Sequence, residues 1–449
     1  MVSPMRKTLT AVGVLVTTLV AGARAQAPAS VSLSFADAVR RAAASAPVVE
    51  LAGLQTSEAD ARVRQARSAF LPSLALSAGW VNRDFNSHSL GITFPTIPGQ
   101  PPFPELIPAF NNYDARITAT ETLLDFSSSS RLRAARAQAD AGGAEQTAVV
   151  EGAAQGAALA YLRAARAAAS AGARRADSSI AAELVHLAEA QKAAGVSAAI
   201  DVTRARTQLV VAEGLLVVAS SESERARIDL ARALGIDPAT PLVLTDTLSS
   251  SLGAADVPGT RDSAVTRAVA ARPDLMAEVA RGVAARRTGS AIAAERLPRL
   301  SVEGDYGVNG LTAPASIATR QVAVQMTIPL IDGFRREGRL AEQDAISQES
   351  AVREQDLRQQ IAADVDAALL DQRSAAAQQR IAAERLLLAE DELSEARERF
   401  SAGVAGNIEV IDAQSSLIQA RDADIDARFS AAVARVSLAR AVGVARTLH

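Results

Sequence analysis

Acidic residues that follow two matching Gly-Val turns are the side chains of this sequence best suited to chemistry. Glu409 and Asp412 come after Gly403-Val404, and Asp201 comes after Gly195-Val196. Glu409 and Asp412 are three residues apart, so they share one face if the segment is helical. Acids at the start of a helix stabilise its dipole, which is the simplest role for these residues. Any further role depends on the elements that hold the turns.

The sequence offers few residues for other catalytic or metal-binding chemistry. The chain has no Cys, which excludes disulfides, Cys-ligated zinc, a thiol nucleophile and lipid attachment to an N-terminal Cys. Its three histidines, His88, His186 and His449, are far apart, and no glycine-rich nucleotide-binding loop or nucleophile motif is present. We therefore predict that the protein is not an enzyme and needs no cofactor or metal. The net charge of −3, with acids and bases interspersed, offers no basic face for nucleic acid.

The composition and the N-terminus indicate an exported helical protein. Half of the chain is hydrophobic (49%) but only 3% is aromatic, and the abundant Ala favours long helices packed closely side by side. Arg6 and Lys7, the apolar stretch 9–20 and the small residues around Ala25 predict a signal peptide at 1–25. No later apolar run reaches the ~18 residues of a membrane-spanning helix. We therefore expect a periplasmic or outer-membrane protein without a transmembrane helix.

An internal duplication covers the rest of the chain. Pro47 falls on Pro273, and at the same offset Leu71-Pro72 falls on Leu297-Pro298. Further on, Gly195 falls on Gly403 without a gap up to the Leu-Ala-Arg-Ala-x-Gly ends at Gly235 and Gly443. The sequence therefore predicts two repeats, 26–237 and 262–449. The segment 238–261 between them is rich in Pro, Thr, Ser and Gly, and we expect it to be an equatorial linker around the outside of the helices.

Each repeat has the same predicted order of helix, strand, strand and long helical hairpin. The first helices span about 35–69 and 262–295, and Leu-Pro ends them because proline disfavours helix in the residue before it. Alternating segments predict strands at about 73–84, 114–124, 299–309 and 320–330, each about the length of a tilted membrane strand. The long helices follow at about 128–193 and 335–401. In the last helix, Ile411, Ile418 and Ile425 recur every seven residues, which predicts a coiled-coil seam.

Four strands cannot close a barrel, and an open sheet edge in lipid leaves backbone groups unpaired. Because about eight strands are needed for closure, this chain must pool its strands with other copies. Three copies give a twelve-stranded barrel with an open lumen and, from the same hairpins, a twelve-helix tube. The predicted fold is therefore mostly α with a small membrane β-barrel part, assembled as a homotrimer.

The duplicated motifs resemble the TolC family of outer-membrane efflux proteins over nearly the whole mature chain. The matching features are the Leu-Pro entries to the strands, the exits Leu124-Asp125-Phe126 and Ile331-Asp332-Gly333, and the turns Ala-Gly-Val-(x4)-Asp-Val and Ala-Gly-Val-(x4)-Glu-Val-Ile-Asp-Ala. The resemblance implies a trimeric channel in the cell outer membrane that extends into the periplasm. It also implies a passive exit duct of a tripartite efflux or type I secretion system, which docks to a periplasmic adaptor and an inner-membrane pump.

The resemblance also implies roles for the turn residues. Gly195, Val196, Asp201, Gly403 and Val404 would form the periplasmic tips where the adaptor docks; simple capping of the helices is the alternative, and the two are compatible. Glu409 and Asp412 would line the narrow periplasmic entrance. Some family members close this entrance with an Arg and a Tyr, but the corresponding positions here are Ala405 and Phe400.

Several alternatives stay open at this point. A soluble periplasmic coiled-coil scaffold or adaptor would explain the signal peptide and the helices but not the four alternating segments. The Pro-rich loop 86–113 is either disordered or an extracellular cap, and Trp80 and Tyr306 are either interface-belt anchors or ordinary barrel packing. The sequence does not identify the exported substrate, the pump, the adaptor or the resting state of the entrance.

Overall fold

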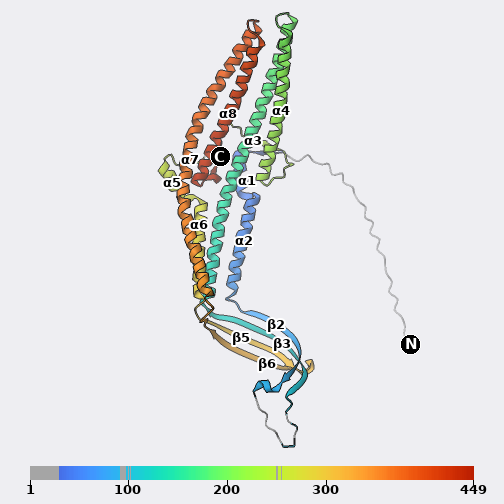
Figure 1. Ribbon diagram of the computed structural model, residues 1–449, viewed down its shortest axis with the longest axis vertical. Helices are drawn as coiled ribbons and strands as arrows, with labels where there is room; N and C mark the ends of the chain where they lie inside the picture. The colour runs from blue at the N-terminus through green and yellow to red at the C-terminus, as the bar shows by residue number, and fades with distance from the viewer. Residues whose placement is uncertain (1–29, 92–97, 100, 102, 249–250, 254) are drawn as a thin grey trace, which may run out of the picture.

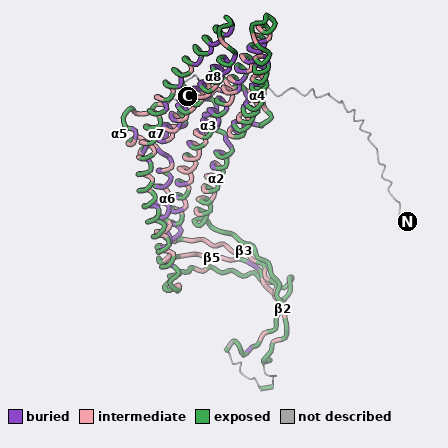
Figure 2. Tube along the Cα trace, turned by 45° about the horizontal axis from the view of Figure 1, so that its top comes forward, coloured by how far each residue is buried: buried purple, intermediate pink, exposed green. Residues whose placement is uncertain are grey.

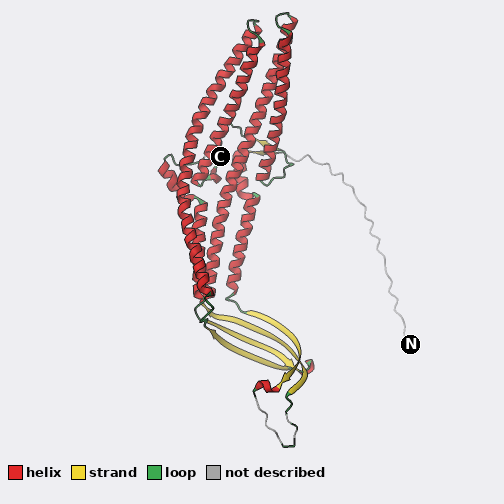
Figure 3. Cartoon of the chain, viewed as in Figure 1, coloured by secondary structure: helices red, strands yellow, loops and turns green. Residues whose placement is uncertain are grey.

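The chain forms an elongated rod with a β-sheet at one end and two helical hairpin turns at the other (Figure 1). The computed structural model describes residues 30–91, 98–99, 101, 103–248, 251–253 and 255–449. The predicted signal peptide at 1–25 lies outside these residues, as does the centre of the Pro-rich loop. All strands of the larger sheet lie at one end of the rod, beyond the last turn of the helices (Figure 3).

The main helices and strands follow one another in the same order in the two repeats. The helices are α1 (Phe35–Ser45), α2 (Pro47–Ser68), α3 (Phe126–Ala193), α4 (Ala199–Ala233), α5 (Arg261–Ala271), α6 (Pro273–Ala294), α7 (Arg335–Ser401) and α8 (Asn407–Val442), with short 3-10 turns η1 (Ser87–Leu90), η2 (Ala313–Ala315) and η3 (Ala445–Thr447). The strands are β1 (Val31–Leu33), β2 (Ser73–Asn86), β3 (Leu106–Asp125), β4 (Leu242–Leu244), β5 (Arg299–Gly310) and β6 (Ile317–Thr327).

The prediction of one continuous first helix in each repeat was wrong. Both helices are interrupted, between α1 and α2 and between α5 and α6. Ala46 and Arg272 are extended, with ψ of 144° and 118°, and Pro47 and Pro273 begin the second helices. A proline forces the residue before it out of the helical region but fits the first turn of a new helix. Each of the two prolines therefore marks the break between the first two helices of its repeat.

The larger sheet is antiparallel with the strand order β2-β3-β5-β6. β3 begins at Leu106, earlier than the predicted strand at about 114–124, although Pro108 argues against a strand there. The structure resolves the conflict in two ways. Pro108 lies at a register shift, between Ile107 and Phe110, which pair with Phe85 and Arg83 of β2. β3 pairs with β5 only from Tyr113 onward. The outer part of β3 thus has β2 on one side and no described strand on the other.

The sheet is amphipathic because paired residues in neighbouring strands point to the same face. One cross-strand row joins Leu74, Ala119, Gly304 and Val322, and the next joins Leu76, Ile117, Tyr306 and Arg320. On the opposite face, one row joins Ala75, Thr118, Asp305 and Gln321. There Arg116 forms ion pairs with Asp114 (2.5 Å) and Asp305 (2.8 Å). A mostly apolar face and a polar face suit a sheet with lipid on one side and water on the other.

Alanines spaced by seven residues pack the two hairpins α3–α4 and α7–α8. The buried series are Ala205, Ala212 and Ala219 in α4, Ala375, Ala382, Ala389 and Ala396 in α7, and Ala413, Ala420, Ala427 and Ala434 in α8. The predicted isoleucine seam lies beside this alanine seam, since Ile411 and Ile425 join hydrophobic clusters that α8 shares with α3. Small side chains let the helix axes approach closely, which accounts for the alanine-rich composition.

The segment 238–261 takes part in a core at the middle of the rod. Its strand β4 pairs in parallel with β1, and Leu242, Leu248 and Leu252 are buried. The Tyr161 hydroxyl of α3 donates to the Leu33 carbonyl (3.1 Å) and accepts from the Asp246 amide (3.1 Å). The linker is therefore fixed to the helices by hydrogen bonds and apolar contacts. In the part of the chain that the structure describes, no helix is both long and apolar enough to cross a membrane.

Candidate functional site

The α3–α4 and α7–α8 turns lie at the far end of the rod from the sheet (Figure 1). They have the same backbone geometry. Gly195 has φ of 74° and Gly403 has φ of 73°, in the left-handed region that favours glycine. The amide of Val196 donates to the Gln191 carbonyl (3.0 Å), and the amide of Val404 donates to the Arg399 carbonyl (3.1 Å). Both turns therefore end their helices with the same glycine-dependent cap.

The structure places Asp201 as a helix cap. Its carboxylate accepts from the Ser197 hydroxyl (2.7 Å) and the Ala198 amide (3.2 Å), and Arg204 lies 3.7 Å away. A carboxylate at the third residue of a helix can reach back in this way to the amide of the residue that precedes the helix, here Ala198. Capping of α4 is therefore enough to explain the position of Asp201.

The two turns contact each other through residues that the sequence did not single out. The Gln191 side chain donates to the Phe400 carbonyl (2.7 Å), and the Asn407 side chain donates to the Asp201 carbonyl (2.8 Å). A side chain at Gly403 would come within 3.3 Å of Val196. These bonds join positions some 200 residues apart in the sequence, so no local pattern could have predicted them. The result is a single paired tip in each chain.

Apolar side chains cover the outer surface of this paired tip. Val196 and Val404, named from the sequence, are exposed, as are Ile200 and Ile408 at the starts of α4 and α8. The two isoleucines occupy equivalent positions of the repeat, which the alignment of the two turns could have indicated. An exposed apolar cluster at a loop tip is a typical contact surface for another protein.

Glu409 and Asp412 share an exposed face of α8 but differ in their surroundings. Glu409 pairs with Arg399 of α7, at 3.3 Å between Oε2 and Nε. Asp412 is exposed, and its side chain forms no hydrogen bond or ion pair within the described residues. Arg399 was not singled out from the sequence, and it reduces the negative charge that the two carboxylates present.

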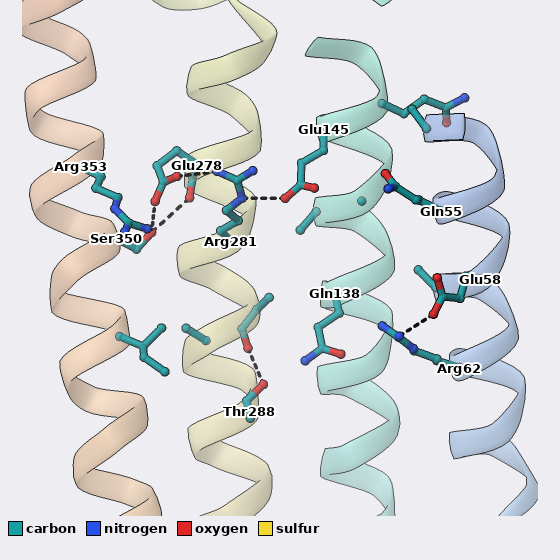
Figure 4. Close-up of a pocket in the computed structure, with 18 of the residues that line it drawn as sticks. Gln55, Glu58, Arg62, Gln138, Glu145, Glu278, Arg281, Thr288, Ser350 and Arg353 are labelled. Atoms are coloured by element: carbon teal, nitrogen blue, oxygen red, sulfur yellow. Dashed lines mark hydrogen bonds and ion pairs between the residues drawn. The ribbon is translucent and has the colours of Figure 1, made fainter. Parts of the chain in front are cut away.

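A polar groove runs along the helices near the sheet. Figure 4 shows side chains from α7, α6, α3 and α2 lining one hollow of about 740 Å³. Arg281 pairs with Glu145 (2.6 Å) and Glu278 (3.0 Å), and the buried Glu278 accepts from the Ser350 hydroxyl (2.9 Å). The hollow that these four helices share is lined by amides and paired charges, which suits a surface in contact with water.

Comparisons with known proteins agree with this architecture. The family described as outer membrane efflux protein matches residues 38–236 and 264–444. Protein CyaE of Bordetella pertussis is 26% identical over 395 residues, which cover 87% of this chain and 79% of CyaE. The CmeC outer membrane channel of Campylobacter jejuni is 16% identical with a TM-score of 0.77, covering 92% of this chain and 86% of CmeC. The open-state MtrE outer membrane channel of Neisseria gonorrhoeae is 17% identical with a TM-score of 0.72, covering 91% of this chain and 88% of MtrE.

These matches confirm the resemblance to the TolC family, whose channels form trimers. They support the channel over the alternative of a soluble scaffold. They also confirm the predicted fold class, the non-enzymatic role and the location in the outer membrane with an extension into the periplasm. The duplicated sequence, the amphipathic four-stranded sheet and the paired helical tips thus identify the chain as a member of the outer membrane efflux protein family, an efflux channel of the outer membrane.

Proposed function

We propose that three copies of this chain form a passive exit duct across the outer membrane and the periplasm. The observation that carries the proposal is the pair of open edges along each chain. Among the strands that the structure describes, β2 and β6 are the outer two of the sheet, and each has one unpaired side. In lipid such edges must be paired, and joining β6 of one copy to β2 of the next pairs them all.

The helices also form a layer with two unlike edges, in the same order as the strands. α2 packs on α3 near the sheet and α4 packs on α3 near the tip, whereas α7 lies at the opposite edge over the whole length. A head-to-tail contact between unlike edges generates a ring when the rotation closes. Three copies with four strands each give twelve strands, enough for an open lumen.

Exposed apolar residues on the two helical edges lie at matching heights. Val217 of α4 and Ile381 of α7 are 71% and 68% exposed, and Val210 and Leu388 are also exposed. Val217 lies about 18 residues from the start of α4 and Ile381 about 20 residues from the end of α7, which places both roughly 27–30 Å from the tip. Much of α7 is exposed in the single chain (Figure 2), and the matching heights support contact between α4 of one copy and α7 of the next.

A second pair of apolar positions supports the same contact near the sheet. Leu51 of α2 and Val352 of α7 are both exposed. Each lies about 17 residues from the sheet end of its helix, or roughly 26 Å. The proposed interface therefore follows α7 along both halves of the tube.

Disulfide trapping tests the ring directly, because the native chain has no cysteine. Val217→Cys combined with Ile381→Cys should give covalent dimers and trimers in outer membranes under mild oxidation. Val217→Cys combined with Val352→Cys is the matched control, since both residues are exposed but lie at different heights. Monomers only, or equal cross-linking in the control, would contradict the proposed interface.

We further propose that the paired tips bind a periplasmic adaptor, which connects the duct to an inner-membrane pump in a tripartite efflux or type I secretion system. The exposed cluster of Val196, Ile200, Val404 and Ile408 supports this role for Gly195, Gly403 and the residues beside them. The capping role of Asp201 is compatible with it, because the cap fixes the shape of the docking surface.

We also propose that Glu409 and Asp412 face the lumen at the narrow periplasmic end. They lie in the first two turns of α8, directly after the tip, on its exposed face. Threefold symmetry would then gather both residues of every copy around one axis. Cation selectivity that depends on these carboxylates, measured in planar bilayers, tests this placement.

A further inference from the structure

The apolar face of the sheet, here called the outward face, ends toward the loops in a belt of aromatic residues. Trp80 of β2 pairs with Tyr113 of β3, and Tyr306 lies on β5. Trp80 is 59% exposed and Tyr306 is 63% exposed. The next outward residues on β2 and β3 are Asn82 and Asn111, which are joined by a hydrogen bond (2.9 Å). Aromatic residues followed by polar ones mark the border of the apolar band of a membrane barrel.

The apolar band crosses the strands at a slant. One cross-strand row joins Leu74 of β2 to Val322 of β6 through β3 and β5. On β2 the outward apolar run begins at this row and continues toward the loops to Trp80, whereas on β6 the exposed run that starts with Met326 and Val324 ends at this row. Strands that are tilted to the membrane normal produce such a slant. The aromatic belt can therefore lie at one level in the membrane although its residues occupy different rows.

Arg320 is the first outward residue beyond the apolar run on β6, the position that Asn82 and Asn111 occupy on their strands. It lies directly opposite Tyr306 in the sheet. Its side chain is exposed and forms no hydrogen bond or ion pair within the described residues. The border of the band thus carries an unpaired guanidinium beside an exposed phenol.

This position favours one kind of ligand. An arginine on the lipid face of a barrel is costly at the midplane of the membrane but costs little at the interface, where its guanidinium can reach lipid phosphates. Guanidinium and phosphate form paired, charge-assisted hydrogen bonds, and the Tyr306 hydroxyl can donate a further one. The helices extend from the other end of the sheet (Figure 1) into the periplasm, so the belt lies in the outer leaflet. That leaflet consists mainly of lipopolysaccharide, whose lipid A carries phosphates just above its acyl chains.

We propose that Arg320 and Tyr306 form a binding site for a phosphate group of lipid A. The site holds the β5–β6 edge of each chain at a fixed depth in the outer leaflet. The inference goes beyond the proposed duct, because it depends on the location of the sheet in the outer membrane and not on the tips, an adaptor or a pump.

Native mass spectrometry of detergent-solubilised trimers titrated with purified lipid A tests the site. Arg320→Gln should weaken lipid A binding about fivefold, the scale of one basic residue at an anionic membrane surface. Arg320→Lys should recover part of this loss, because it keeps the charge but not the paired geometry. Lipid A stripped of its phosphates should bind the native chain as weakly as intact lipid A binds Arg320→Gln.

Arg299→Gln is the matched control. Arg299 is also exposed, and its side chain is unpaired among the residues that the structure describes, but it lies on the polar face of the sheet in the row of Asp125 and Thr327. This variant should bind lipid A as the native chain does.

Unchanged lipid A binding by an assembled Arg320→Gln trimer would overturn the proposal. Equal weakening of phosphatidylglycerol binding would contradict the assignment to lipid A. If Arg320→Gln does not assemble, the native trimer supplies the test, and equal binding of lipid A with and without its phosphates would overturn the site. Failure of the native chain to form trimers would contradict the proposed function instead.

Discussion

The ion selectivity of the channel should follow the net charge of Glu409, Asp412 and Arg399. Each chain brings two carboxylates and one guanidinium to this level, a net charge of −1, so three chains bring −3. Replacing either acid by Ala reduces this to zero, and replacing both leaves +3. Arg399→Ala should act in the opposite direction, because it leaves the six carboxylates unbalanced at −6.

The size of the effect follows from Coulomb attraction to the ring. At roughly 8 Å from three net charges in water, a monovalent ion has an energy of about 1.6 kcal/mol before screening. Salt at physiological strength reduces this to about a third over one Debye length of ~8 Å. Cations and anions then differ by about 1.2 kcal/mol, which is roughly a fivefold to tenfold preference for cations.

Planar-bilayer recording of reversal potentials in a salt gradient measures this preference. We expect Asp412→Ala to lower the cation-to-anion permeability ratio roughly fivefold to tenfold and Arg399→Ala to raise it by a similar factor. Block by multivalent cations added from the periplasmic side should change in the same sense. Asp256→Ala is the control, because Asp256 is 96% exposed beside Arg267, far along the chain from the turns. Unchanged selectivity in both Asp412→Ala and Arg399→Ala trimers would place these residues outside the lumen.

Three further perturbations test the tip, the docking surface and the mid-rod core. Gly403→Val places a β-branched residue at φ of 73°, so we expect about 1–2 kcal/mol of local strain, lost export and an intact trimer by native gel; loss of the trimer would indicate a folding role instead. Val196→Asp with Val404→Asp should abolish adaptor co-purification but preserve channel conductance, whereas retained binding would place docking elsewhere. Burial alone would raise the pKa of Asp274, but the hydrogen bonds and charge of Arg272 hold it below its ordinary value of 3.8. Its stabilisation is therefore present above that value and lost as the pH falls below it, and thermal melts from pH 7 to 3 should show a smaller acid loss in Asp274→Asn.

The sequence predicted features that depend on regular spacing or duplication. The period-two segments indicated the strands, and the two Gly-Val turns indicated the tips, since both signals are local. Pro47 and Pro273 were recognised as repeat markers, but their break of the first helices was missed because the apolar pattern continues through them. The outer half of β3 was missed because Pro108 is tolerated only at an unpaired, shifted position that a sequence does not display.

The interactions missed from the sequence join residues of different helices. The Arg399 partner of Glu409 lies on the preceding helix and becomes its neighbour when α7 and α8 form their hairpin. The Gln191 side chain and the Phe400 carbonyl are more than 200 residues apart, and they become neighbours only when the two hairpins pack together. The isoleucine heptad of α8 was easier to see than the alanine heptad beside it, because large apolar residues dominate a hydrophobic pattern even where small ones form the closer contact.

The alanine seams set a dimension of the assembled tube. In a ring of twelve parallel cylinders, the distance between neighbouring axes fixes the circumference. Packed helices stand 8–10 Å apart depending on the side chains between them, so the ring of axes would be roughly 31 Å across at the close spacing and roughly 38 Å at the wide one. Alanine at every seventh position selects the close spacing. The bore of the duct is thus encoded in the smallest side chains of its wall, and enlarging them in register would widen the passage without changing the number of helices around it.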